Sequence, residues 1–215
     1  MNRVRYCLIA AAIWMASCAS PAVHAPESTR IASADPSTLQ PVSAFTDIRD
    51  REQRSAAYFV EAGRVLQHPR CLNCHPQTRM PTQGDDLHAH VPIMHATETG
   101  HGLPALQCNT CHQSANVSTY VKSLGSVPGH PHWSLAPASM AWQGLSLQQL
   151  CEQVKDPARN GGRSLQAIHE HVAKDSLVGW AWHPGEGRAP APGTQHEFGE
   201  LMNAWIQTGA VCPRS

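Results

Sequence analysis

The sequence predicts a small, mainly α-helical protein with long irregular loops and few or no strands. Apolar residues recur at helical spacing in three stretches, near residues 46–67, 164–174 and 194–209. Two helix starts carry a Ser or Thr followed three residues later by Gln or Glu, the pattern of a capping box. No stretch shows a convincing strand pattern, and 15 Gly and 17 Pro among 215 residues indicate extensive loops.

The N-terminus predicts a signal peptide over residues 1–25. Arg3 and Arg5 give a positive start, and the mostly apolar run from Cys7 to Ala16 is too short to span a bilayer comfortably. A small-residue cleavage site ends at Ala25.

A second interpretation of this region is lipidation at Cys18, within Met15-Ala-Ser-Cys18. Either processing event places the mature protein outside the cytoplasm, and we expect it in the periplasm. It would be bound to a membrane only if Cys18 is lipidated.

Residues 26–45 are rich in Pro, Ser and Thr and lack periodicity, which predicts a flexible linker. The folded domain is then expected over residues 46–213. A helix is predicted from about Thr46 to Gln67, and His68-Pro69 ends it.

Irregular structure is expected over 76–107 and 123–145, and three helices follow. The first begins at a capping box of Ser146 and Gln149 and ends near Asp156.

The second of these helices covers Ser164 to Lys174. After a loop rich in Pro and Gly over 184–193, the third begins at a capping box of Thr194 and Glu197 and ends at Gly209.

Two copies of one five-residue pattern carry the chemistry: Cys71-Leu-Asn-Cys74-His75 and Cys108-Asn-Thr-Cys111-His112. C-x-x-C-H is the attachment pattern of c-type haem. Its two cysteines can form thioethers with the two vinyl groups of one porphyrin, and the adjacent histidine can bind the iron. The sequence therefore predicts two covalently bound haem c groups with His75 and His112 as proximal ligands.

The sixth ligand of each iron is less clear from the pattern. His90 lies in the loop between the motifs, which is expected to wrap the first haem; we favour it as a ligand, with a solvated loop histidine as an equal alternative. Met140 and His132 are alternatives from the next loop. On the helix 164–174, periodicity places His169 nearer the apolar stripe than His171.

Composition agrees with buried cofactors. Aromatic residues make up only 6% of the chain, so two porphyrins would supply much of the missing apolar core. The net charge is zero, which gives no electrostatic case for binding nucleic acid. Arg159, Arg163 and Arg188 are candidates for pairing with haem propionates.

Cysteine counting predicts one disulfide bond. Of 8 Cys, two lie in the leader and four in the haem motifs, which leaves Cys151 and Cys212 as a pair in an oxidising compartment.

Five segments resemble small bacterial di-haem cytochrome c family proteins, often catalogued as isoquinoline 1-oxidoreductase subunit. These segments are Trp133-Ser-Leu-Ala-Pro, Ser139-Met-Ala-Trp142, Lys155-Asp-Pro-Ala-Arg-Asn-Gly-Gly162, Leu177-Val-Gly-Trp-Ala-Trp182 and Gly209-Ala-Val-Cys-Pro213. The resemblance implies a ligand at His171, which we adopt over His169. It also implies that the protein accepts electrons from an oxidoreductase, because the chain lacks the length and cysteine pattern of a molybdenum hydroxylase.

The function expected from the sequence is electron transfer between a periplasmic oxidoreductase and the respiratory chain, without enzymatic activity of its own. Two different functions stay open. One is a peroxidase-like haem enzyme or sensor with an open iron, and the other is a structural zinc protein that uses the C-x-x-C pairs.

Overall fold

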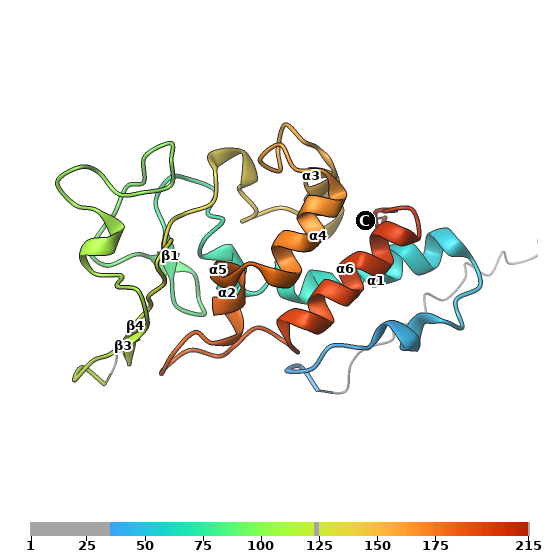
Figure 1. Cartoon of the computed structure of the whole chain (residues 1–215), viewed down its shortest axis with the longest axis horizontal. Helices are drawn as coiled ribbons and strands as arrows, with labels where there is room; N and C mark the ends of the chain where they lie inside the picture. The colour runs from blue at the N-terminus through green and yellow to red at the C-terminus, as the bar shows by residue number, and fades with distance from the viewer. Residues whose placement is uncertain (1–34, 123–124, 215) are drawn as a thin grey trace, which may run out of the picture. The chain divides into compact units, whose positions relative to one another are not determined.

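The chain is mainly helical in the computed structural model, which describes residues 35–122 and 125–214 (Figure 1). The predicted signal peptide, the lipidation position Cys18 and linker residues 26–34 lie outside the described residues. The α-helices are α1 (Arg51–Leu66), α2 (Pro69–Leu72), α3 (Leu147–Lys155), α4 (Leu165–Lys174), α5 (Ser176–Gly179) and α6 (Gln195–Gln207). The 3-10 helices are η1 (Val42–Phe45), η2 (Cys108–Thr110), η3 (Ala138–Met140) and η4 (Trp180–Trp182).

The described strands are two residues long and form two antiparallel hairpins. β1 (Thr82–Gln83) pairs with β2 (His88–Ala89), and β3 (Val117–Ser118) pairs with β4 (Ser126–Val127). The prediction of a mainly helical fold is confirmed, and the strands are too short to have produced a periodic signal in the sequence.

The core lies where α6 packs against α1 and α4 (Figure 1). The rings of Phe59 and Trp205 meet there with centroids 4.8 Å apart, and neither side chain is exposed. Both predicted capping boxes are present, at Ser146 with Gln149 and at Thr194 with Glu197. We define α1, α3, α4 and α6 as the helical core.

Helix α1 begins five residues later than predicted. Asp50 accepts a hydrogen bond from the Gln53 amide 2.8 Å away and caps the first turn. The preceding residues form η1 instead, whose Phe45 is buried against Tyr58 at a centroid separation of 5.1 Å.

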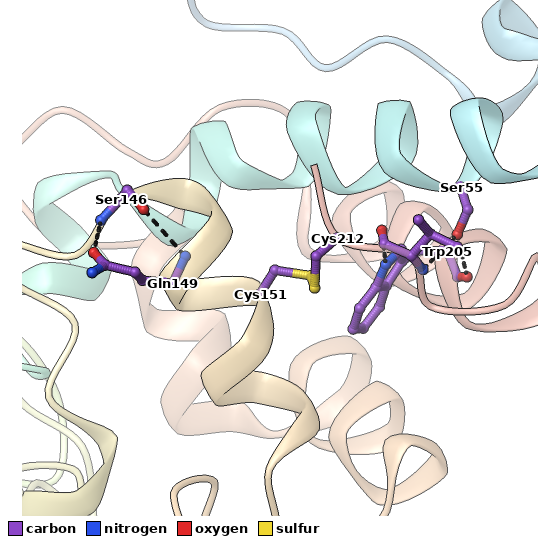
Figure 2. The surroundings of a disulfide bond; sticks show 7 residues. Ser55, Ser146, Gln149, Cys151, Trp205 and Cys212 are labelled. Carbon is purple, nitrogen blue, oxygen red and sulfur yellow. Dashed lines mark hydrogen bonds between the residues drawn. A yellow bond between two sulfur atoms is a disulfide. The ribbon is translucent and has the colours of Figure 1, made fainter. Parts of the chain in front are cut away.

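The predicted disulfide between Cys151 and Cys212 is present and joins α3 to the C-terminal tail (Figure 2). Trp205 holds the same tail, because its indole N–H donates to the Val211 carbonyl 3.0 Å away. The Val211 amide in turn donates to the Ser55 hydroxyl at 3.1 Å. A covalent bond and a buried hydrogen-bond network therefore fix the end of the chain.

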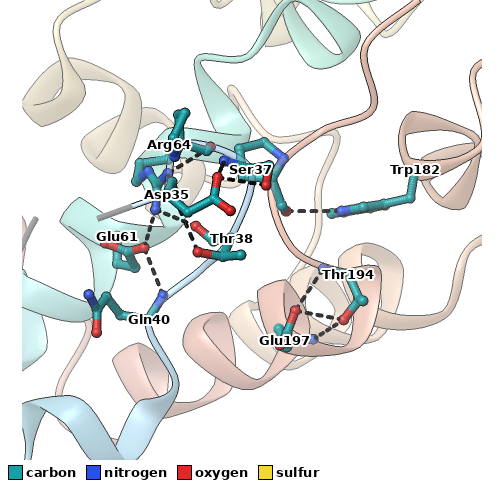
Figure 3. A network of polar contacts seen from close by, with 11 residues as sticks. Asp35, Ser37, Thr38, Gln40, Glu61, Arg64, Trp182, Thr194 and Glu197 are labelled. Atoms are coloured by element: carbon teal, nitrogen blue, oxygen red, sulfur yellow. Dashed lines mark hydrogen bonds and ion pairs between the residues drawn. The ribbon is translucent and has the colours of Figure 1, made fainter. Parts of the chain in front are cut away.

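Residues 35–45, the described part of the predicted linker, contact α1. The Arg64 guanidinium donates to the carbonyls of Thr38 and Pro36 at 2.6 and 2.8 Å, and the Gln40 amide donates to Glu61 at 3.0 Å (Figure 3). Leu39, at 7% exposed, anchors the segment further. Composition did not show this, because the partners lie on α1, more than twenty residues along the chain.

Residues 67–139, which we call the loop region, have almost no core of their own. Apart from prolines and glycines, Ala96 is the one hydrophobic residue buried among its described residues. Most of the exposed large hydrophobic residues of the described chain lie in this region: Met80, Val91, Ile93, Leu103, Leu106, Val117, Tyr120 and Val121. Segments with so little buried apolar surface need another source of stability.

Candidate functional site

The first motif begins inside α2 and ends at a histidine held from two sides. The His75 Nδ1–H donates to the Met140 carbonyl 2.7 Å away. The His75 ring also stacks on Trp142, with centroids 3.5 Å apart and planes 7° from parallel. Backbone bonds from Trp142 to the His75 carbonyl and from Ala136 to the Cys74 carbonyl tie this partner segment to the motif.

The second motif lies on η2 and repeats this arrangement. The His112 Nδ1–H donates to the Pro128 carbonyl 2.8 Å away. Its ring stacks on Trp133, with centroids 4.7 Å apart and planes 14° from parallel. Trp133 is supported in turn by an edge-on contact with Trp180.

Each motif histidine therefore has its Nδ1 used and its Nε2 free of protein partners in the described contacts. Histidines that bind metals usually donate their other ring N–H to a carbonyl or carboxylate, which fixes the tautomer and the ring orientation. One segment, residues 128–142, supplies the carbonyl and the tryptophan to both His75 and His112.

The first motif is also poorly solvated. Burial raises the pKa of Cys71 to about 12 and of Cys74 to about 11, although each residue as a whole keeps partial exposure. Burial lowers the pKa of His75 to about 4, the hydrogen bond to Met140 opposes this shift, and a charge on His171 lowers the pKa further. Burial likewise lowers the pKa of His112. All four groups are therefore neutral at pH 7.

His90 lies beside the second motif, whereas its loop was predicted to wrap the haem of the first. Its ring centroid is 5.9 Å from that of His112, with planes 52° apart. The His90 Nδ1–H donates to the Pro92 carbonyl at 2.8 Å. Position in the chain did not show this neighbour, because the β1–β2 hairpin turns the loop back toward η2.

His171 lies on α4 in the neighbourhood of the first motif. Its Nδ1 is 3.2 Å from an Asp175 carboxylate oxygen, and its charge is felt by His75. Burial lowers the pKa of His171, and the Asp175 charge opposes that effect. His169, which periodicity favoured, has a buried Nδ1 with no hydrogen-bond partner among the described residues.

Met140 and His132, the loop residues considered as sixth ligands, take different positions. The Met140 carbonyl approaches His75 from the Nδ1 side, and its side chain is only 6% exposed. Met140 therefore supports His75 at Nδ1 and does not lie opposite Nε2, the nitrogen that would bind iron. His132 is exposed, and its amide donates to the His130 ring at 3.1 Å.

Arg70, a buried charge directly before Cys71, was not predicted from the sequence. It forms an ion pair with Asp85, and its Nε is buried without a hydrogen-bond partner among the described residues. Burial lowers the pKa of Arg70, and the charge of Arg188 lowers it further. Arg188, predicted as a propionate partner, also acts on His112 and donates to the Ser126 hydroxyl at 2.8 Å.

Asn73, between the two cysteines of the first motif, was missed as well. Its amide donates to the Gly84 carbonyl at 2.9 Å, and its side-chain oxygen accepts from the Thr82 hydroxyl at 2.7 Å. Nothing in the spacing of the motif marks this residue as the anchor of a hairpin.

No helix within residues 35–122 and 125–214 is both long and apolar enough to cross a membrane. In the same residues, no three side chains of His, Cys, Asp or Glu are grouped so that they could hold a metal ion. Comparisons with models of protein families, with curated proteins and with solved structures found no match for this chain.

Proposed function

We propose that this chain is an exported di-haem c-type cytochrome that carries single electrons between a periplasmic oxidoreductase and the respiratory chain. The observation that carries the proposal is the equivalence of the two C-x-x-C-H motifs. Both histidines donate Nδ1–H to a backbone carbonyl and stack on a tryptophan, so each presents Nε2 in a fixed orientation. When bound, each haem supplies an iron that gains and loses one electron.

The four motif thiols, Cys71, Cys74, Cys108 and Cys111, would hold the porphyrins covalently. Each thiol would add across one vinyl double bond: its S–H bond breaks, the sulfur bonds to one vinyl carbon, and the hydrogen goes to the other. Nothing is released and no oxidant is needed, so the mass of the chain rises by two intact haems. The structure leaves these four thiols unpaired, while the other described cysteines form the disulfide.

The loop region fits a bulky apolar group. Apart from prolines and glycines, it buries one hydrophobic residue among those described, Ala96, and it exposes side chains as large as Ile93 and Tyr120. A porphyrin covered by these side chains would remove that surface from water and stabilise the loops.

Haem propionates also have a suitable partner in Arg70. Its Nε is buried without a partner among the described residues, and the neighbouring charge of Arg188 makes the region favourable for an anion. A carboxylate there would satisfy the buried donor.

The sixth ligands determine whether the protein carries electrons or reacts with small molecules. His171 is our candidate at the first motif, where its ring lies in the neighbourhood of His75 and donates to Asp175. Histidine on both faces closes the iron to substrates and favours a low potential. The protein then acts as a carrier, and a redox partner protein is needed at each end.

Purified mature protein, made in a host that attaches haem c, tests the proposal. We expect an intact mass with two added haems and no spectral response of the reduced protein to carbon monoxide. The double variants Cys71→Ala/Cys74→Ala and Cys108→Ala/Cys111→Ala should each retain one haem.

A haem enzyme and a zinc protein would give different results in the same experiments. Carbon monoxide binding by the wild-type protein would favour a haem enzyme or sensor with an open iron. A chain with no haem and stoichiometric zinc would overturn the proposal in favour of a structural zinc protein.

A further inference from the structure

We propose that His90 binds the iron of the second motif, on the face opposite His112, although it follows the first motif in the chain. This inference rests on the proposed function, since it requires a haem at Cys108 and Cys111. From its position in the sequence alone, His90 would be assigned to the iron of the first motif.

The separation of the two rings is the first argument. Two imidazoles that bind one metal ion from opposite faces, at about 2 Å from metal to nitrogen, place their ring centroids about 6 Å apart. The centroids of His90 and His112 are 5.9 Å apart. A face-to-face stack would be closer, as in the 3.5 Å stack of His75 on Trp142. The rings of His130 and His132 are also 5.8 Å apart, but the His130 Nε2 is already bonded to the Ser176 hydroxyl, so separation and a free Nε2 must be taken together.

The hydrogen bonds of both rings give the second argument. His90 and His112 each donate Nδ1–H to a backbone carbonyl at 2.8 Å, from Pro92 and Pro128 respectively. Each ring therefore keeps Nε2 as its available ligand atom. Nearby His88 is different: it pairs with the exposed Asp86 carboxylate, and its own side chain is 48% exposed.

The position of His90 is fixed by the β1–β2 hairpin. The His90 amide donates to the Pro81 carbonyl at 3.2 Å, and the next amide, of Val91, donates to the Gln83 side chain at 3.1 Å. Thr82 bonds to Asn73, inside the first motif. The hairpin is thus anchored at the first motif and presents His90 to the second.

This arrangement links the two sites through a short piece of protein. Asn73, between Cys71 and Cys74, anchors the hairpin, and the hairpin positions His90 as a ligand for the iron held by His112. We therefore expect the haems to be close neighbours, and loss of the first motif to loosen the ligand of the second.

Carbon monoxide titration of the reduced two-haem protein tests the assignment. Wild type should bind none, and His90→Ala should bind one per chain, with added imidazole competing. His88→Ala and His95→Ala are matched controls from the same loop and should bind none. If His90→Ala binds no carbon monoxide and keeps the wild-type spectrum, His90 is not a ligand, while two bound haems would leave the proposed function standing.

Single-haem chains identify which iron is opened. With Cys71→Ala/Cys74→Ala, adding His90→Ala should open the remaining iron; with Cys108→Ala/Cys111→Ala, it should change nothing. The opposite pattern would overturn the inference. If these chains do not fold, the two-haem His90→Ala, His171→Ala and His90→Ala/His171→Ala variants are compared. Where each single variant binds one carbon monoxide, two per chain in the double variant support separate irons, and one contradicts them.

Discussion

Removing the disulfide should destabilise the protein by about 2–4 kcal/mol. Closing a loop across a sequence separation of 61 residues lowers the entropy of the unfolded chain by an amount worth about 4 kcal/mol. The tail keeps its bonds from Trp205 and Ser55, so the native structure should survive in Cys151→Ala/Cys212→Ala (Figure 2). The measured loss should then approach, without exceeding, the entropic value.

Equilibrium unfolding in guanidinium, followed by circular dichroism on the two-haem protein, measures this loss. Covalently bound haem would stay attached in both the wild type and the variant, so its effect on the unfolded state would largely cancel. Ser146→Ala, which removes the capping box of the same helix α3, should cost about 1 kcal/mol and serves as control. A disulfide variant within about 1 kcal/mol of wild type would refute the reasoning and leave the hydrogen-bond network as the main anchor.

Three further predictions concern single side chains. Arg70→Gln removes a buried positive charge beside the first motif and should lower a haem midpoint potential by on the order of tens of millivolts, whereas Arg51→Gln, tested by the same redox titration, should not. Burial and then the charge of Arg70 lower the pKa of His68 to about 4. As the pH falls, His68 is therefore protonated in the unfolded chain at a higher pH than in the folded protein. The free energy of unfolding should therefore fall between pH 6.5 and 4 in the wild type, and fall less steeply in His68→Asn, as measured by urea unfolding at each pH. Asn at this position keeps a side chain that can cap the helix. Thr194→Ala should cost about 1 kcal/mol in the same assay at pH 7, because it removes the cap shared with Glu197.

The helical core was predictable because its signals are local. Ser146 and Thr194 each carry a side chain that caps its own helix three residues on, so the start of α3 and α6 could be read from four adjacent residues. The disulfide was predictable by elimination among the cysteines. Elements such as α2, α5 and the strands have two to four residues, too few for a period to appear.

The site was predictable only where ligands share a motif. The motif pattern predicts the cysteines that accompany His75 and His112, but the carbonyls of Met140 and Pro128 come from a segment that shows no pattern in the sequence. His90 was assigned by its place in the sequence, and the hairpin that redirects it depends on Asn73. Hydrogen bonds between residues far apart in the sequence produce no recognisable residue pattern, so they could not be predicted.

The haem-free chain should keep its helical core and lose the structure of the loop region. The reason is the distribution of buried apolar surface: Phe59 and Trp205 are fully buried between helices, whereas residues 67–139 bury only Ala96 among their described hydrophobic side chains, prolines and glycines aside. Replacing all four motif cysteines with alanine should therefore preserve most of the helical circular dichroism. Trypsin should cut at Arg79 and Lys122 roughly tenfold faster, or more, than in the two-haem protein.

Cleavage within the helical core provides the internal comparison for that experiment. Arg54 on α1 and Lys155 on α3 belong to the helical core, so we expect their cleavage rates to change little. Equal acceleration at Arg54 and Arg79 would mean that the helices also need the cofactor. Equal protection at Arg79 in both proteins would mean that hydrogen bonds such as those from Arg79 to Ala136 and Thr97 hold the loops unaided. Equal protection would remove the argument that the porphyrins serve as the core of the loop region, equal acceleration would remove the argument that the helical core is independent of them, and selective cleavage in the loop region would support both.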